Sequence, residues 1–219
     1  MKKLLIYYDN PNEASDMYLK WLKKDCEKQG IEYEIVENYT DFYNTIKDNH
    51  SAYKVLPMMP VNDRGVIDFL HYKTEWIDNT LLDIDNACGD NEYYVDATAK
   101  GIYDHIVEMR PDRSTTIAVI GRGRIGKVLV DMLIDYGYTV CVFNSKSDRI
   151  IRMGILNECH IVVGLSAQDD IIDERDINDR LHKKIFIDAS HNFNFGGNRT
   201  VLRCGKWTRE VLLSRLKED

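Results

Sequence analysis

Residues 117–126 of the chain read Ile-Ala-Val-Ile-Gly-Arg-Gly-Arg-Ile-Gly. A short apolar run rich in β-branched residues leads directly into Gly121-x-Gly123-x-x-Gly126, and the segment that follows has apolar residues at helical spacing. A strand, a glycine turn and a helix in this order are typical of a dinucleotide-binding unit. There Gly121 permits the tight turn, Gly123 lets the backbone approach a pyrophosphate, and Gly126 allows the helix to pack closely on the strand. The alternative is a tight turn that holds no ligand.

The alternation of strand and helix extends in both directions from this stretch. Six short apolar or alternating segments are expected to be strands: residues 3–8, 31–37, 53–56, 139–143, 161–165 and 185–188. Helical spacing separates them, and strands that alternate with helices predict parallel sheets. We therefore expect an α/β protein of two α/β lobes, the second a Rossmann-type doubly wound parallel sheet.

A boundary between the lobes is expected near residue 110. A strongly amphipathic helix is predicted at residues 98–109, and Pro111-Asp112-Arg113 follows it directly. We predict a first lobe at residues 1–110, completed by a C-terminal helix at residues 206–219, and a dinucleotide-binding lobe at residues 111–205.

Turn residues predict the ends of elements in the first lobe. Asn12 or Ser15 is expected to cap a helix at residues 14–29, and Gly30 is placed to end it. Pro57-Met58-Met59-Pro60 follows an apolar strand and is expected to leave regular structure.

Composition excludes several classes of protein. The 219 residues carry a formal net charge of −7 without a long basic run, which argues against nucleic acid as the main partner. The five cysteines are scattered with no C-x-x-C pair, a pattern that fits reduced thiols in the cytoplasm better than disulfides or a metal site. No apolar run approaches the length of a membrane span, so no membrane partner is expected.

The end of the strand at residues 139–143 bears on the choice of cofactor. NAD-binding units place a carboxylate about 20 residues past the glycines, whereas Asn144-Ser145-Lys146-Ser147 stands there in this chain. Hydroxyls, an amide and a cation suit a 2′-phosphate, so NADP is favoured over NAD. The alternative is that Lys146 is solvated and Asp148 merely caps the next helix. The predicted cofactor-binding residues are Gly121, Arg122, Gly123, Arg124, Ile125, Gly126, Asn144, Ser145 and Lys146.

Further segments form an ordered series across nearly the whole chain: Ser15-x-x-Tyr18 with Lys24 and Gly30-Ile31, Val55-Leu56-Pro57-Met58-Met59-Pro60, Leu82-Asp83-Ile84-Asp85-Asn86, Asp96-Ala97-Thr98-Ala99-Lys100-Gly101, residues 119–126, Asn144-Ser145-Lys146-Ser147, Phe186-Ile187-Asp188-Ala189-Ser190-His191-Asn192 and Gly205-Lys206-Trp207-Thr208. In this order they resemble the motifs S-x-x-Y-x-x-x-K-x-K, V-Q-L-P-L-P, K-D-V-D-G, P-C-T-P-x-G, V-I-G-R-S-x-x-V-G, H-S-x-T, V-I-D-V-G-I-N and G-P-M-T. These motifs are those of the bifunctional methylenetetrahydrofolate dehydrogenase/cyclohydrolase family, and their shared order carries the resemblance.

The resemblance implies two lobes around a cleft, a folate substrate, a nicotinamide cofactor presented from the second lobe, and a homodimer. It implies that Tyr18 stacks on the pterin ring and that Asp85 binds the amino edge of that ring, which makes these two the catalytic-site residues. A carboxylate also suits ring N–H donors on chemical grounds alone. The alternatives are that Tyr18 is a core aromatic residue of an amphipathic helix and that Asp85 is a solvated loop acid.

The chain departs from the family pattern at two catalytic positions. The family's lysine, four residues after the tyrosine, falls on Leu22, and its glutamine before Leu-Pro falls on Val55. The neighbouring lysines are one or two residues away, and one helical residue rotates a side chain by ~100°. Loss of the ammonium and amide that would activate water makes cyclohydrolase activity doubtful, whereas hydride transfer depends mainly on positioning.

These observations leave three hypotheses. The first is a cytoplasmic NADP-dependent dehydrogenase that oxidises 5,10-methylenetetrahydrofolate to the 5,10-methenyl form. The second is a family member that binds nucleotide or folate without turnover. The third is an unrelated two-lobed oxidoreductase, for which His191 is the obvious catalytic candidate, although a loop histidine of no special role is the simpler interpretation.

Overall fold

The chain folds into two compact units. The computed structural model describes residues 2–75, 77–87, 89, 91–144, 146–177, 184–196 and 199–218. Unit 1 comprises Met1–Ala97 with Arg209–Asp219, and unit 2 comprises Thr98–Thr208. The helix α4 (Ala97–Glu108) therefore falls almost wholly in unit 2, whereas the sequence-based boundary stood at residue 110.

Unit 2 is built on a five-stranded parallel sheet with the order β10-β8-β6-β4-β5. Its strands are β4 (Thr116–Ile120), β5 (Thr139–Phe143), β6 (Ile161–Gly164), β8 (Ile185–Asp188) and β10 (Val201–Arg203). The other elements are α5 (Arg124–Tyr136), α6 (Arg149–Glu158), the short helix η3 (Glu174–Asp176), and the two-stranded pair β7 (Ile172–Asp173) and β9 (Phe193–Asn194), while α7 (Gly205–Arg215) runs from this unit into unit 1.

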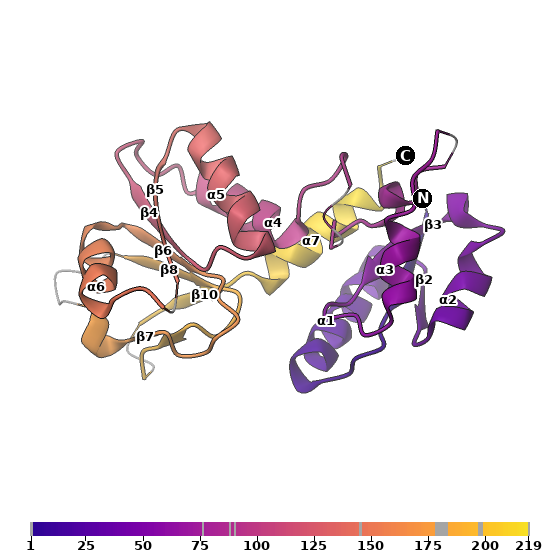
Figure 1. Ribbon diagram of the computed structural model, residues 1–219, viewed down its shortest axis with the longest axis horizontal. Coiled ribbons are helices and arrows are strands. Elements are labelled where there is room, and N and C mark those ends of the chain that lie inside the picture. Colours follow the sequence, from indigo (N-terminus) through magenta and orange to yellow (C-terminus); the bar gives the residue numbers. More distant parts are fainter. Residues whose placement is uncertain are drawn as a thin grey trace. The chain divides into compact units, whose positions relative to one another are not determined.

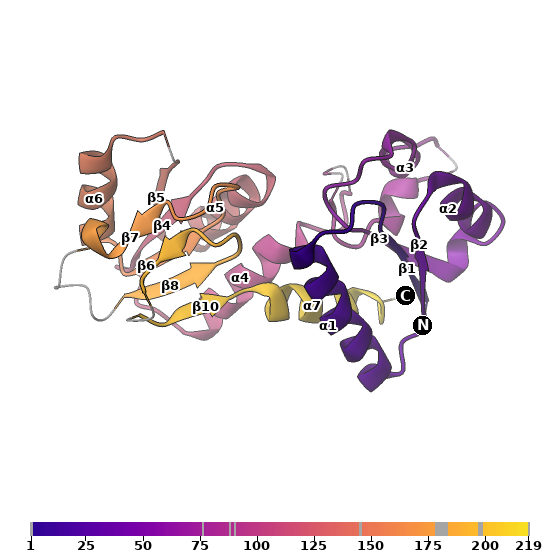
Figure 2. The ribbon, with the colours of Figure 1, turned by 90° about the horizontal axis from the view of Figure 1, so that it is seen from below.

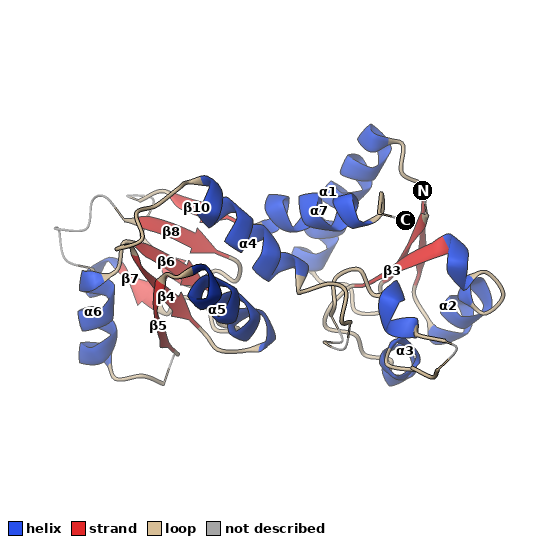
Figure 3. Cartoon of the chain, turned by 90° about the horizontal axis from the view of Figure 1, so that it is seen from above, coloured by secondary structure: helices blue, strands red, loops and turns tan. Residues whose placement is uncertain are grey.

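Apolar side chains cover both faces of this sheet, as a parallel sheet requires. On one face, Val119 and Ile117 pack against α4 and α5, and on the other face Ala118 and Ile120 pack against α6 and a cluster of phenylalanines. Figure 1 and Figure 3 show α5 and α6 on opposite sides of the sheet. The predicted α/β class with a Rossmann-type parallel sheet is confirmed.

Unit 1 contains a smaller parallel sheet with the order β2-β1-β3, where β1 (Lys3–Tyr7) lies between β2 (Tyr33–Val36) and β3 (Tyr53–Pro57). One face carries α1 (Glu13–Gln29) and the end of α7, and the other carries α2 (Tyr39–Ile46) and α3 (Arg64–Leu70). Figure 2 shows α1 and α2 on opposite sides of these strands. Two short helices complete the unit, η1 (His50–Ala52) and η2 (Asn79–Leu82).

Alternation along β1 and β3 assigns side chains to the two faces. Leu4 and Ile6 join the cluster beneath α1, whereas Leu5 and Tyr7 join the cluster beneath α2 and α3. The expectation that residue 57 leaves regular structure is wrong, because Pro57 pairs with Tyr7 at the end of β3. Because β3 is the last strand of the sheet, the missing N–H of a proline is tolerated there.

The last turns of α7 hold a loop of unit 1 in place. The guanidinium of Arg215 donates hydrogen bonds to the carbonyl oxygens of Ile84 and Val95 and lies 4.6 Å from the centre of the Tyr94 ring. Burial lowers the pKa of Arg215 but leaves this strongly basic group charged. Ile84, Tyr94 and Val95 are thus tied to the C-terminal helix.

The predicted ends of α1 are confirmed. The Asn12 side chain accepts a hydrogen bond from Ser15 N at 3.0 Å, and the Ser15 hydroxyl accepts one from Asn12 N at 3.0 Å. Gly30 ends the helix with a φ of 67°. Asn12 and Ser15 therefore form a reciprocal capping box rather than acting as alternatives.

We expect Asn12→Ala to lower the free energy of unfolding of the protein by about 1 kcal/mol, because the first-turn amide of Ser15 loses its acceptor. Asn12→Ser keeps an acceptor at this position and serves as the matched control. Urea denaturation followed by circular dichroism measures both variants, and equal stability of the two would show that Asn12 does not cap α1.

Candidate functional site

Two of the three glycines in the turn after β4 are required by packing. Gly121 has a φ of +99°, and a β-carbon there would lie 2.9 Å from the Leu165 carbonyl oxygen. A β-carbon on Gly126 would lie 2.2 Å from the Gly121 carbonyl oxygen, so no larger residue fits without moving the backbone. The helix α5 consequently begins in direct contact with the end of β4.

The middle glycine is different. Gly123 caps α5 without a side-chain hydrogen bond to the first turn, and a β-carbon on it would have nothing within 4 Å. Its φ of −71° is open to any residue, so neither packing nor backbone geometry calls for glycine. The first amides of α5 lack a side-chain cap and carry the positive end of the helix dipole, which favours an anion.

Strand order places this turn at a topological switch point. β5 and β6 lie on either side of β4, and ligands of open α/β sheets bind outside the carboxyl ends of strands at such a point. Gly121 N donates to the Phe143 carbonyl at 2.8 Å, and Leu165 N donates to the Ile120 carbonyl at 2.8 Å. The ends of β5 and β6 are thereby fixed beside the glycine turn.

The remaining predicted nucleotide-binding residues surround this turn. Arg122, Arg124, Asn144 and Lys146 are exposed, and Ile125 is half-buried against the core. Ser145 lies outside the described residues.

The segment after β5 is a compact polar turn. Asn144 Oδ1 accepts from Lys146 N at 2.8 Å, and Asn144 N donates to the Ser147 hydroxyl at 3.1 Å. Asp148 accepts from Ile150 N at 2.8 Å and caps α6, so this carboxylate is engaged with a helix.

Asn192 was missed as a site residue by the sequence reasoning. It is fully buried; its Oδ1 accepts from Ser166 N at 2.9 Å and its Nδ2 donates to the Ser166 carbonyl at 2.9 Å. Asp188 accepts from Asn192 N at 3.1 Å and pairs with Arg203 at 2.7 Å. These contacts join the loops after β6 and β8. In the sequence, the feature that indicates such a network is the spacing Asp-x-x-x-Asn in residues 188–192. The neighbouring His191 is exposed, and its carbonyl accepts from Asp170 N at 3.0 Å, which adds a further bond between the two loops.

In unit 1, Tyr18 lies half-buried on α1, and a cation covers its ring. The Arg209 guanidinium lies 5.7 Å from the centre of the Tyr18 ring and 5.3 Å from that of Trp21. Arg209 Nε also donates to Asp25 Oδ2 at 2.6 Å, which fixes the guanidinium over the rings.

Asp85 lies half-buried in the loop after η2. Its Oδ1 accepts from Ala97 N at 3.3 Å, and its own N–H donates to Asp83 Oδ1 at 3.2 Å. Asp85 is therefore part of an ordered hydrogen-bonded segment rather than a freely solvated acid.

The two positions at which the family carries lysine and glutamine are apolar and fully buried. Leu22 packs beneath α1 with Leu4 and Leu56, whereas Val55 packs on the opposite face of the sheet beneath α2 and α3. Leu22 and Val55 therefore lie on opposite faces of the sheet. Leu56, one residue further on, is the β3 residue on the face of Leu22.

The lysines that neighbour Leu22 point elsewhere. Lys20 and Lys24 are exposed, and together with the half-buried Lys23 they border a shallow hollow of about 360 Å³ with Asp16 and Glu27. None of them replaces the missing ammonium on the face of Leu22.

Lys54 is a buried lysine that the sequence reasoning did not single out. It is 8% exposed and donates to the Leu81 carbonyl at 3.2 Å and to the Tyr94 hydroxyl at 3.4 Å. Burial lowers the pKa of Lys54. The same burial raises the pKa of the Tyr94 phenol.

The described part of the chain holds no group of three or more His, Cys, Asp or Glu side chains placed to bind a metal ion. Among the same residues, no helix is both long and apolar enough to cross a membrane.

Fold and site together define an α/β protein with a Rossmann-type unit. No family model matches the chain. It is 24% identical over 199 residues to the bifunctional protein FolD of Petrotoga mobilis, a match that covers 87% of this chain and 71% of that relative. The FolD of Picrophilus torridus is 26% identical over 152 residues, which cover 69% of this chain and 53% of the relative.

Solved structures share the fold over nearly the whole chain. A 5,10-methylenetetrahydrofolate dehydrogenase from the silkworm Bombyx mori superposes with a TM-score of 0.70 at 15% identity, covering 98% of this chain and 85% of that one. The Trypanosoma brucei dehydrogenase-cyclohydrolase, complexed with NADP and an inhibitor, gives 0.69 at 15% identity over 97% and 84% of the two chains. The NAD-dependent dehydrogenase of Saccharomyces cerevisiae gives 0.69 at 15% identity over 98% and 86%.

The sequence matches and the shared fold support the resemblance to the bifunctional methylenetetrahydrofolate dehydrogenase/cyclohydrolase family, as the order of the motifs predicts.

We expect Leu22→Lys to lower the free energy of unfolding by about 3–5 kcal/mol, because it places an unpaired ammonium in an apolar core. Burial would depress the pKa of the introduced group, so the unfolded state would bind more protons and the deficit would shrink as pH rises. We also expect no gain of methenyltetrahydrofolate hydrolysis.

Leu22→Met is the control for this substitution and should change stability by less than about 1.5 kcal/mol. Thermal and urea denaturation at several pH values give the comparison. A stable Leu22→Lys protein that hydrolyses the methenyl substrate would contradict the assignment of this position to the core.

Proposed function

We propose that the chain is an NADP-dependent methylenetetrahydrofolate dehydrogenase without cyclohydrolase activity. NADP supplies a hydride acceptor when bound, and the reaction transfers one hydride from the methylene carbon to give the methenyl product and NADPH. The observation that carries the proposal is Gly123, a glycine that packing does not require, at the uncapped start of a helix on a switch point.

The residues of unit 2 fit a nicotinamide dinucleotide. The open space at Gly123 and the first amides of α5 suit the pyrophosphate. The network of Asn192 and Asp188 rigidly supports the adjacent loops, which favours a preformed site.

NADP is preferred to NAD in this proposal because of charge at the edge of the site. Lys146, Arg122 and Arg124 are exposed around the turn, and Asp148 is occupied by capping α6. Cations and an amide favour a 2′-phosphate, whereas a ribose 2′-hydroxyl calls for a carboxylate acceptor.

The loss of cyclohydrolase activity rests on the core of unit 1. Hydrolysis of the methenyl product requires a group that activates water, and Leu22, Val55 and Leu56 are all apolar and buried. Tyr18 and Asp85 remain as the proposed folate-contacting residues, with Asp85 presenting its carboxylate to the pterin N–H donors.

A second candidate is a family member that binds nucleotide or folate without turnover. The specific observation that favours it is Arg209, which lies over the Tyr18 ring that would stack on a pterin. Either proposal includes a cytoplasmic location and a homodimer. Cys26, Cys141, Cys159 and Cys204 form no disulfide in the described part of the chain, which accords with a reducing compartment.

The test is a turnover assay on the purified chain with methylenetetrahydrofolate and either NADP or NAD. We expect reduced cofactor and methenyl product in equal amounts, with kcat/KM for NADP about tenfold or more above that for NAD, since hydrogen bonds to a charged phosphate contribute about 1.5–3 kcal/mol. Methenyl hydrolysis should match the enzyme-free rate. Absence of turnover with both cofactors, combined with measurable NADP binding, would favour the second candidate.

We expect Gly123→Ala to weaken NADP binding at least about tenfold while changing the free energy of unfolding by less than about 1 kcal/mol, because its β-carbon meets only the space proposed for the pyrophosphate. Gly126→Ala is the contrasting variant. It should destabilise unit 2 itself, because its β-carbon meets a backbone oxygen at 2.2 Å. Calorimetric titration and thermal denaturation separate the two effects, and unchanged NADP affinity in a stable Gly123→Ala protein would exclude a pyrophosphate at this turn.

A further inference from the structure

Two cysteines of unit 2 share one cluster of side chains. Cys141 and Cys159 both pack in the apolar cluster on the face of the unit 2 sheet that carries α6. Cys204 belongs to the cluster on the other face of this sheet, and Cys26 belongs to the core of unit 1. Among the described cysteines, the fold therefore brings Cys141 and Cys159 together.

The backbone explains why these two thiols meet. Cys141 is the middle residue of β5, and alternation along the strand sends Val140 and Val142 to the face of α4 and α5 and Cys141 to the face of α6. Cys159 follows the last turn of α6, where its N–H donates to the Ile155 carbonyl at 3.1 Å. The end of a helix that crosses this face is thus placed over a strand that presents a thiol to it.

A small neighbour leaves room for the contact. Ala118 is the β4 residue paired with Cys141, and it lies in the same cluster as Cys159. Burial raises the pKa of the Cys159 thiol to about 12, and the neighbouring Cys141, through its charge and a hydrogen bond between the two side chains, adds to the rise. The Lys184 ammonium, which donates to the Cys159 carbonyl, opposes it.

The two thiols differ in their access to solvent. Cys159 is 1% exposed, and because of its raised pKa it stays protonated near neutral pH. Cys141 is half-buried and lies on β5, the last strand of the sheet. A reagent from solution therefore reaches Cys141 first, with a second thiol held behind it.

We propose that Cys141 and Cys159 are a site of reversible oxidation, at which a hydroperoxide converts the two thiols into an intramolecular disulfide. The Cys141 sulfur attacks the hydroperoxide, so that an S–O bond forms, the O–O bond breaks and water or an alcohol leaves. The Cys159 sulfur then attacks the Cys141 sulfur, the S–S bond forms, and the hydroxyl group leaves with the Cys159 proton as water. The two sulfurs lose two electrons in total, which the hydroperoxide gains, and a dithiol reductant returns them.

The disulfide would close a loop that contains the whole of α6 and the polar turn at Asn144 and Lys146. Closing a loop restricts the unfolded chain, so the oxidised protein should be the more stable form. The reaction needs neither nucleotide nor folate, so it does not depend on the dehydrogenase function proposed above.

The test is treatment of the reduced full chain with hydrogen peroxide near neutral pH, followed by alkylation of free thiols, digestion and mass spectrometry. We expect a peptide pair that links Cys141 to Cys159 and that dithiothreitol separates. We also expect the Tm of the oxidised chain, measured by circular dichroism without reductant, to rise by about 5 °C.

Alanine variants separate the two roles. Cys159→Ala should stop the reaction at a sulfenic acid on Cys141, which dimedone traps, and should abolish the rise in Tm. Cys141→Ala should leave Cys159 as a free thiol that is alkylated after denaturation. Cys204→Ala removes a buried thiol on the other face of the same sheet and serves as the matched control, in which the linked peptide and the rise in Tm are kept.

Two results would overturn the proposal. The first is oxidation of Cys141 to a sulfinic acid in the unsubstituted chain while Cys159 remains a free thiol. The second is a disulfide that joins either residue to another cysteine or to a second copy of the chain. Both are read on the unsubstituted protein, so the outcome does not depend on the folding of a variant.

Discussion

Unit 2 depends on a close approach between two backbone segments, the end of β4 at Gly121 and the first turn of α5 at Gly126. The Gly121 carbonyl oxygen stands 2.2 Å from where a β-carbon of residue 126 would be, so α5 can begin only directly against the end of β4. Gly121 also abuts the Leu165 carbonyl, and Asn192 then joins the loop after β6 to the loop after β8. The scaffold of the candidate nucleotide site is therefore made of backbone and buried amides. Exposed side chains around the turn, such as that of Lys146, can be substituted without disturbing this scaffold.

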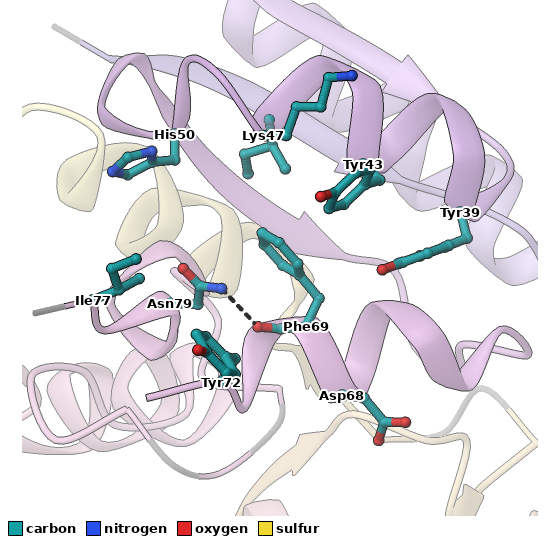
Figure 4. A pocket seen from close by; sticks show the side chains of 10 residues that line it. Tyr39, Tyr43, Lys47, His50, Asp68, Phe69, Tyr72, Ile77 and Asn79 are labelled. Atoms are coloured by element: carbon teal, nitrogen blue, oxygen red, sulfur yellow. Dashed lines mark hydrogen bonds between the residues drawn. The ribbon is translucent and has the colours of Figure 1, made fainter. Parts of the chain in front are cut away.

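Unit 1 uses a single sheet to build two unlike surfaces. Alternation along β1 and β3 sends Leu4, Ile6 and Leu56 towards α1, and sends Leu5, Tyr7 and Val55 towards α2 and α3. On the first face Leu22, which stands at the position of the lysine in the motif that this chain resembles, is part of the core. On the second face the aromatic residues of α2 and α3 do not close over one another, which leaves a hollow of about 420 Å³ beside Asn79, as Figure 4 shows. Leu22 thus contributes a fully buried apolar side chain to the core of the first face.

Strongly periodic segments and turn residues were predictable from the sequence. The strands and helices around residues 117–143 and the cap at Asn12 follow from local patterns that the fold keeps. β10 was missed because a strand of three residues at a sheet edge, two half-buried and one exposed, shows no alternation. Pro57 was misjudged because edge pairing depends on strand order. Val55 lies on the face of the sheet opposite to Leu22, whereas Leu56 lies on the same face, because successive residues of a strand point to opposite faces. The contacts of Asn192 with Ser166, and the hollow beside Asn79, are made by segments that lie far apart in the sequence, so local sequence patterns do not predict them.

The clamp made by Arg215 links the loop that carries Asp85 to the last helix of the chain. Leu212, Leu213 and Leu216 complete the core beneath α1, so unit 1 is assembled from both ends of the polypeptide, whereas unit 2 is one continuous segment. During synthesis from the N-terminus, unit 2 can therefore reach its native fold before unit 1 has all of its core residues. Until residues 209–218 have been synthesised, unit 1 lacks the three leucines of α7 and its neighbouring turn, and the apolar face beneath α1 stays open to solvent.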